Sequence, residues 1–173
     1  NGNENVAVGV WSYYNASTGN GNTAIGFAAL SRWEVTNAYY FNGSTGNYNT
    51  AIGAYSSWDN QAGAGNTTLG YNAGYNISSG SNNVAIGYNS ANSGTNNLTT
   101  GSNNIIVGYN AAASSATVSN EITLGNSSIA TIRAQVTTIT SLSDARDKKN
   151  IERLKHGLAF VNSLAPVKFD WNM

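Results

Sequence analysis

A serine and a lysine stand five residues apart in the most charged part of the chain, the stretch 143–151 (Ser-Asp-Ala-Arg-Asp-Lys-Lys-Asn-Ile). A serine hydroxyl becomes a nucleophile where a neighbouring base takes its proton, and a lysine amine can be that base where burial or nearby charge lowers its pKa. A turn could bring Ser143 and Lys148 together over this spacing. The other interpretation is a charged, solvated loop before a helix, which is the commoner origin of such a run.

The residues around this stretch predict a helix followed by a short strand. From Asn150 onward, apolar side chains recur at helical spacing, at Ile151, Leu154, Leu158 and Val161. Pro166 ends this helix, and the alternation in 167–171 (Val-Lys-Phe-Asp-Trp) is typical of a strand. We therefore expect a short α/β segment at the C-terminus, in which the serine and the lysine precede the helix.

The distribution of charge divides the chain of 173 residues into parts. Charged residues make up only 9% of it, and ten of them lie between Asp144 and Asp170. We place a repeat region at 1–128, a neck strand rich in β-branched residues at 129–142, and the beginning of another domain at 143–173. The chain opens at Asn1 without an initiator methionine, so we expect it to be a fragment.

The bulk composition argues against several classes of function. The net charge is zero, so no basic field attracts nucleic acid or an anionic membrane. No apolar run approaches the ~20 residues that span a bilayer. Cysteine is absent, and we expect no cofactor and no metal. The repeats offer neither paired carboxylates nor a histidine-centred constellation, so an enzyme acting on an external substrate is not indicated.

Residues 1–128 are organised around a five-residue unit of the type found at 22–26 (Asn-Thr-Ala-Ile-Gly), which we call the repeat motif. Its closing glycines stand at positions 9, 26, 53, 70, 87, 108 and 125. The step is 17 residues, interrupted by one insertion of ten and one of four. A fixed period of this kind marks a solenoid, in which each coil buries its apolar face against its neighbours. We interpret the last copy of the motif, at 120–125, as carrying one extra residue.

Each repeat motif predicts a short strand, because large and small side chains alternate along it. In 23–27, Thr, Ile and Phe share one face, and Ala and Gly share the other. We expect the large face to fill the coil interior and the small face to admit another backbone. The predicted fold is all-β, a repetitive parallel β-roll or solenoid of about seven coils. One thin stack of coils buries little apolar area, so several chains should associate along its axis.

Aromatic residues suggest a binding surface. The ten-residue insertion between the second and third repeat motifs contains the candidate receptor-binding residues Arg32, Trp33, Tyr39, Tyr40 and Phe41. Flat rings on a projecting loop bury area at low entropic cost, as a sugar- or protein-binding site requires, although the same rings could pack onto the coil beneath them. The aromatics that follow the closing glycines fit better as a structural stripe (Phe27, Tyr71, Tyr88 and Tyr109).

The repeat motif and its spacing resemble two groups of proteins. They look like the head repeats of trimeric autotransporter adhesins and like the stacked repeats of phage tail fibres. Either resemblance implies a homotrimer of left-handed parallel β-roll coils. The 17-residue step departs from the shorter step common in the adhesin heads.

The C-terminal stretch resembles the start of the endosialidase-type intramolecular chaperone. The resemblance rests on Ser143-Asp144-x-Arg146-x-Lys148-x-Asn150-Ile151, then a helix, then Pro166-Val167-x-Phe169-x-Trp171. That module assembles the trimer of phage tail spikes and fibres and then cuts itself off through a Ser-Lys dyad. The resemblance implies that Ser143 is the nucleophile and Lys148 the base, with scission at or beside the Ser143–Asp144 bond.

Together these features predict the structural, host-attaching part of a viral tail fibre, located at the distal end of the fibre in the virion. Its partners would be two further copies of the chain and a host cell-surface receptor, glycan or protein. The alternative is the head of a trimeric adhesin on a bacterial surface. The repeats alone do not separate the two, whereas the stretch 143–151 favours the virus.

Overall fold

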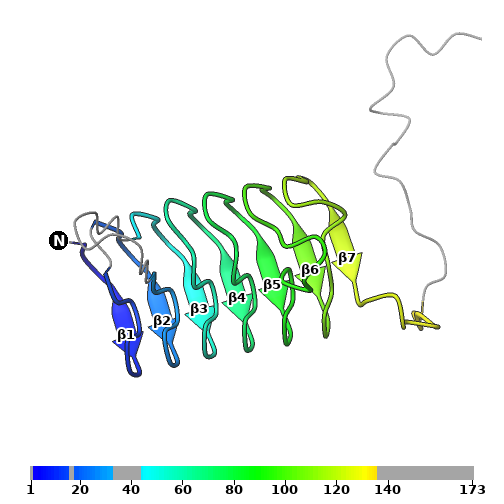
Figure 1. Cartoon of the computed structure of the whole chain (residues 1–173), viewed down its shortest axis with the longest axis horizontal. Helices are drawn as coiled ribbons and strands as arrows, with labels where there is room; N and C mark the ends of the chain where they lie inside the picture. The colour runs from blue at the N-terminus through cyan, green and yellow to red at the C-terminus, as the bar shows by residue number, and fades with distance from the viewer. Residues whose placement is uncertain (1, 16–17, 33–43, 136–173) are drawn as a thin grey trace, which may run out of the picture. The chain divides into compact units, whose positions relative to one another are not determined.

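The computed structural model describes residues 2–15, 18–32 and 44–135. Within these ranges it contains seven short strands and no helix (Figure 1). The strands are β1 (Val6–Val8), β2 (Thr23–Ile25), β3 (Thr50–Ile52), β4 (Thr67–Leu69), β5 (Val84–Ile86), β6 (Ile105–Val107) and β7 (Ile122–Leu124). The predicted α/β segment and half of the predicted neck strand, 136–142, lie outside the described residues, and the described half, 129–135, contains no strand.

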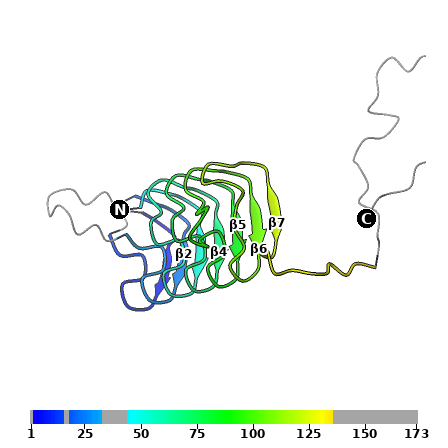
Figure 2. The same ribbon diagram turned by 45° about the vertical axis from the view of Figure 1, so that its right-hand side comes forward.

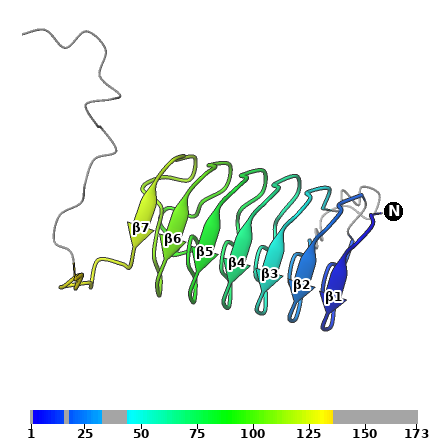
Figure 3. The same cartoon turned by 180° about the vertical axis from the view of Figure 1, so that it is seen from behind.

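All seven strands belong to one parallel sheet in the order β1 to β7, so each coil stacks on the one before it. Figures 2 and 3 show the row of strands from two further directions. Equivalent positions of the repeat motif pair directly, as Ala24 does with Ala51 across the ten-residue insertion. The strands therefore keep their register on either side of both insertions. This confirms the predicted all-β parallel solenoid.

The interior of the solenoid corrects the predicted assignment of the two strand faces. The small central residue of the strand is the buried one, as at Ala24, Ala51 and Ala85, whereas the large flanking residues remain half-buried or exposed. The central position is not restricted to alanine, since Thr68 in β4 and Ile106 in β6 are also only 1% exposed. Ser90 lies opposite β6, and its hydroxyl donates a hydrogen bond of 2.7 Å to the carbonyl of Ile106.

A ladder of buried asparagines joins the coils. The residue before each of β2 to β6 is an asparagine that is about 99% buried or more (Asn22, Asn49, Asn66, Asn83 and Asn104). Each backbone N–H donates to the side-chain oxygen of the equivalent asparagine one coil earlier, and each side-chain amide donates to a carbonyl of the following coil. The recurring asparagine is therefore a buried polar spine, and its groups are satisfied without water.

The last coil continues this ladder with a glutamate, which corrects the interpretation of 120–125. The backbone N–H of Glu121 donates to the side-chain oxygen of Asn104 over 2.9 Å, as the asparagines do elsewhere. Ile122 pairs with Ile105, so the strand is in register and the coil carries no extra residue. Glu121 replaces the asparagine, and Asn120 occupies the position that precedes it.

The closing glycine of the repeat motif is required by its backbone and by its neighbours. At Gly70, φ is +132°, a conformation that residues with a Cβ rarely adopt. A Cβ added there would lie 2.6 Å from the carbonyl oxygen of Gly87 in the next coil. The glycine thus allows two backbones to approach closely where the chain turns out of the strand.

Candidate functional site

The described residues contain only part of the predicted site. Arg32 is described: its Nε lies 3.1 Å from Oδ1 of Asp59, and its side chain is 15% exposed. This pair holds Arg32 against the solenoid surface. The other predicted residues lie outside the described ranges, and their roles stay predictions (Trp33, Tyr39, Tyr40, Phe41, Ser143, Asp144 and Lys148).

Aromatic rings form a continuous ladder along the turns that follow the strands. The ring of Tyr71 stacks on that of Tyr88 with centroids 5.3 Å apart, and Tyr88 stacks on Tyr109 at 5.6 Å. On the other side of Tyr71 the row continues through Tyr55, Phe27 and Trp11. The predicted stripe therefore exists, but its rings remain substantially exposed, from 37% at Phe27 to 63% at Tyr109.

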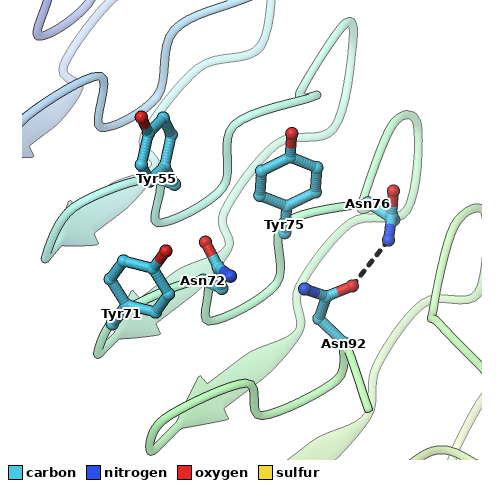
Figure 4. Close-up of a pocket in the computed structure, with 6 residues that line it drawn as sticks. All are labelled: Tyr55, Tyr71, Asn72, Tyr75, Asn76 and Asn92. Atoms are coloured by element: carbon cyan, nitrogen blue, oxygen red, sulfur yellow. Dashed lines mark hydrogen bonds between the residues drawn. The ribbon is translucent and has the colours of Figure 1, made fainter. Parts of the chain in front are cut away.

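The ladder opens into a pocket of about 440 Å³ beside the turns that follow β3, β4 and β5. It is lined by three tyrosines and three asparagines (Tyr55, Tyr71, Tyr75, Asn72, Asn76 and Asn92). Figure 4 shows Tyr55 and Tyr71 at one end of the pocket, Asn76 and Asn92 at the other, and Asn72 and Tyr75 between them. Flat apolar surfaces thus lie next to several hydrogen-bonding groups, as is usual in binding sites for small polar ligands.

Two contacts fix the walls of this pocket. The ring of Tyr75 stacks on that of Trp58, with centroids 5.0 Å apart and planes 11° apart. At the end of the pocket away from Tyr55 and Tyr71, the side-chain amide of Asn76 donates to the side-chain oxygen of Asn92 over 2.6 Å (Figure 4). Burial, and then the negative charge of Asp59, raise the pKa of Tyr75, so its hydroxyl stays protonated at neutral pH.

The sheet presents a second distinctive surface, which we call the outer sheet face. It consists of the first and third residues of the strands, every one of which is valine, isoleucine, leucine or threonine. Its most exposed aliphatic members are Val6, Val8, Ile25, Leu69, Ile105, Ile122 and Leu124. Parallel sheets are normally covered on both faces, so an apolar face left open within one chain marks an interaction surface.

The part of the chain that the structure describes shows no cluster of three or more metal-ligating His, Cys, Asp or Glu residues. Nor does any helix within it have the length and apolar character needed to cross a membrane.

Sequence reasoning missed most of the pocket. Tyr55 and Tyr75 were not singled out, because Tyr55 stands two residues after its closing glycine and Tyr75 five residues after the next one. One signal was present in the sequence: the turns after the third and fourth repeat motifs together hold four aromatic residues, Tyr55, Trp58, Tyr71 and Tyr75. Their convergence depends on the turn geometry, since Tyr55 has a φ of +57°.

Comparison with known proteins gives one finding for the C-terminal segment. A family model described as chaperone of endosialidase matches residues 143–172. No curated protein and no solved structure matches the chain. The matched segment includes Ser143 and Lys148 and supports the resemblance to the start of this chaperone. The resemblance of the repeats to tail fibres and adhesin heads stays a prediction.

Proposed function

We propose that this chain is the host-attaching, structural part of a viral tail fibre and that it works as a homotrimer. The observation that carries the proposal is the outer sheet face, which lies N-terminal in sequence to a segment similar to the chaperone of endosialidase. A solenoid supplies a stiff, repetitive rod. A C-terminal chaperone supplies the means of bringing its copies together.

A second copy of the same chain is the occupant that best fits the outer sheet face. The face extends over all seven strands and carries no charge. Its aliphatic and threonine side chains recur at the same two positions of each strand. Identical chains set side by side at equal height therefore present aliphatic residues to one another coil after coil. Burial of such side chains, at roughly 25 cal/mol per Å², stabilises the assembly and covers the second face of the parallel sheet.

The test is the mass of the full chain in solution, measured by light scattering. A single chain has a mass of 18.1 kDa, and the proposal requires a particle of three times that mass. Leu69→Asp places a charge on the outer sheet face and should give monomers or aggregates. Thr100→Asp, on an exposed turn, is the matched control and should remain trimeric. A folded wild-type monomer overturns the proposal, and a trimeric Leu69→Asp variant shows that another surface joins the chains.

Self-processing belongs to the same proposal. Ser143 would act as the nucleophile and Lys148 as its base, with the chain cut at or beside the Ser143–Asp144 bond. A bacterial trimeric adhesin would share the trimer and the attachment role, so cleavage in the full-length gene product distinguishes the two. For attachment itself, the insertion is the first candidate: Trp33→Ala and Tyr40→Ala should weaken adsorption to cells that bind the wild type.

A further inference from the structure

We propose that the pocket beside the turns after β3, β4 and β5, which we call the tyrosine pocket, binds a neutral pyranose oligosaccharide. The inference rests on the proposed attachment function and gives it a site and a ligand class. The pocket lies on the solenoid itself, and none of its lining residues is one of the candidate receptor-binding residues of the ten-residue insertion. Its six lining residues all belong to turns, so association through the outer sheet face does not use them.

The aromatic wall suits the apolar faces of sugar rings. Tyr71 is 44% exposed, and Tyr55 meets it edge to face with centroids 6.0 Å apart and planes 88° apart. Tyr75 forms the third side and is held by its stack on Trp58. Rings fixed in this way lose little entropy on binding, and the parts of their surfaces that remain open to solvent can receive the C–H groups of a pyranose.

The amide wall suits sugar hydroxyls. Within the described residues, the bond between Asn76 and Asn92 uses one donor and one acceptor, and leaves the oxygen of Asn76 and the amide nitrogen of Asn92 without a partner (Figure 4). A neighbouring donor and acceptor match a pair of vicinal hydroxyls, each of which both donates and accepts. Asn72, between the two walls, adds a third amide. The pocket therefore offers directional contacts as well as apolar surface.

The electrostatics of the pocket select a neutral ligand. None of its six lining residues is charged. The nearest charge described beside it, Asp59, acts on Tyr75 and is paired with Arg32. An anionic sugar would find no cation to pair with there, and a cationic one would find a carboxylate already engaged.

The ligand is an oligosaccharide and not a single sugar, because the aromatic surface continues beyond the pocket. Tyr88 and Tyr109 extend the ladder from Tyr71 with nearly parallel rings, 16° and 21° apart, and are 48% and 63% exposed. Because the stacked rings cover one another's faces, a chain of sugars leaving the pocket would meet the exposed edge of one ring per coil. Each contact is weak, and the repetition of contacts gives useful affinity.

The experiment applies the full chain to an array of immobilised neutral oligosaccharides of glucose, galactose and mannose, with uronic and sialic acid oligomers beside them. The best-bound neutral glycan is then titrated against three variants. Tyr71→Ala and Asn92→Ala should each raise the Kd about tenfold or more. Tyr14→Ala is the matched control, since Tyr14 is 47% exposed and lies outside the pocket, and it should leave the Kd unchanged.

The thermal unfolding of every variant is measured, and a loss of binding is interpreted only for variants that are folded. A wild type that binds no neutral glycan, binds only the acidic ones, or binds equally well after Tyr71→Ala overturns the inference. A trimeric chain that adsorbs to cells but binds no neutral glycan would refute the pocket and leave the proposed function standing. A monomeric chain that binds a neutral glycan would refute the proposed homotrimer and leave the pocket standing.

Discussion

The asparagine ladder can be tested at its centre with Asn66→Ala. The side-chain oxygen of Asn66 accepts hydrogen bonds from the backbone and side-chain N–H groups of Asn83, at 2.9 and 3.1 Å. Its amide donates to the carbonyl of Gly80 over 2.8 Å. Alanine keeps the backbone N–H that bonds to Asn49 but removes all three of these bonds.

The magnitude follows from the groups that the substitution leaves unsatisfied. The side-chain amide of Asn83 retains its bond to the carbonyl of Gly101, so two groups lose their partner, the N–H of Asn83 and the carbonyl of Gly80. A buried polar group without a partner costs about 1–3 kcal/mol, which gives about 2–6 kcal/mol in total. That is a large part of the stability of an ordinary domain, about 5–15 kcal/mol.

The assay is urea unfolding of the full chain at one fixed protein concentration, because association adds to apparent stability. Asn96→Ala is the control: it removes a single exposed hydrogen bond of 2.9 Å to Ser114, and it should cost about 1 kcal/mol or less. If the free energies of unfolding of Asn66→Ala and Asn96→Ala differ by less than about 1 kcal/mol, the hydrogen bonds of Asn66 do not stabilise the stack of coils and the reasoning fails.

Three further predictions concern the backbone, pH and processing. Gly70→Ala should lower the unfolding temperature more than Gly94→Ala, because both have a positive φ but only Gly70 has a neighbouring carbonyl within 4 Å of an added Cβ; equal losses would contradict this. Hydrogen bonds from Ser114 hold the pKa of Glu121 below its ordinary value of 4.5, so the stability from its ionised form is present above that value and lost as the pH falls through the lowered pKa. Glu121→Gln should therefore flatten the acid side of the stability-versus-pH curve, and an unchanged curve would refute the role. Ser143→Ala should leave the full-length gene product uncut in intact-mass measurements, whereas cleavage of both forms near this position would exclude Ser143 as the nucleophile.

The part of the site that could be read from the sequence was the part encoded by residue type and spacing. The stripe of aromatics after the closing glycines was predictable, since an equal step between glycines places equivalent residues above one another. The pocket was not, because Tyr55 and Tyr71 stand at different offsets from their glycines. The two rings meet through the geometry of their turns, in which Tyr55 has a positive φ.

The sequence by itself determined that the chain forms stacked coils and which residues pair. In a parallel stack each strand bonds to its own equivalent, so a repeated motif dictates its register, and Thr23 pairs with Thr50 across an insertion of ten residues. Alternation along the strand defined two faces but not which one is buried. Tertiary structure decided that, because the coil closes around the central residue of the strand, whether Ala24 or Ile106, and leaves the two flanking residues half-buried or exposed. The same packing placed Glu121 in the ladder and assembled the tyrosine pocket, since both depend on how neighbouring coils meet and not on the residues within one coil.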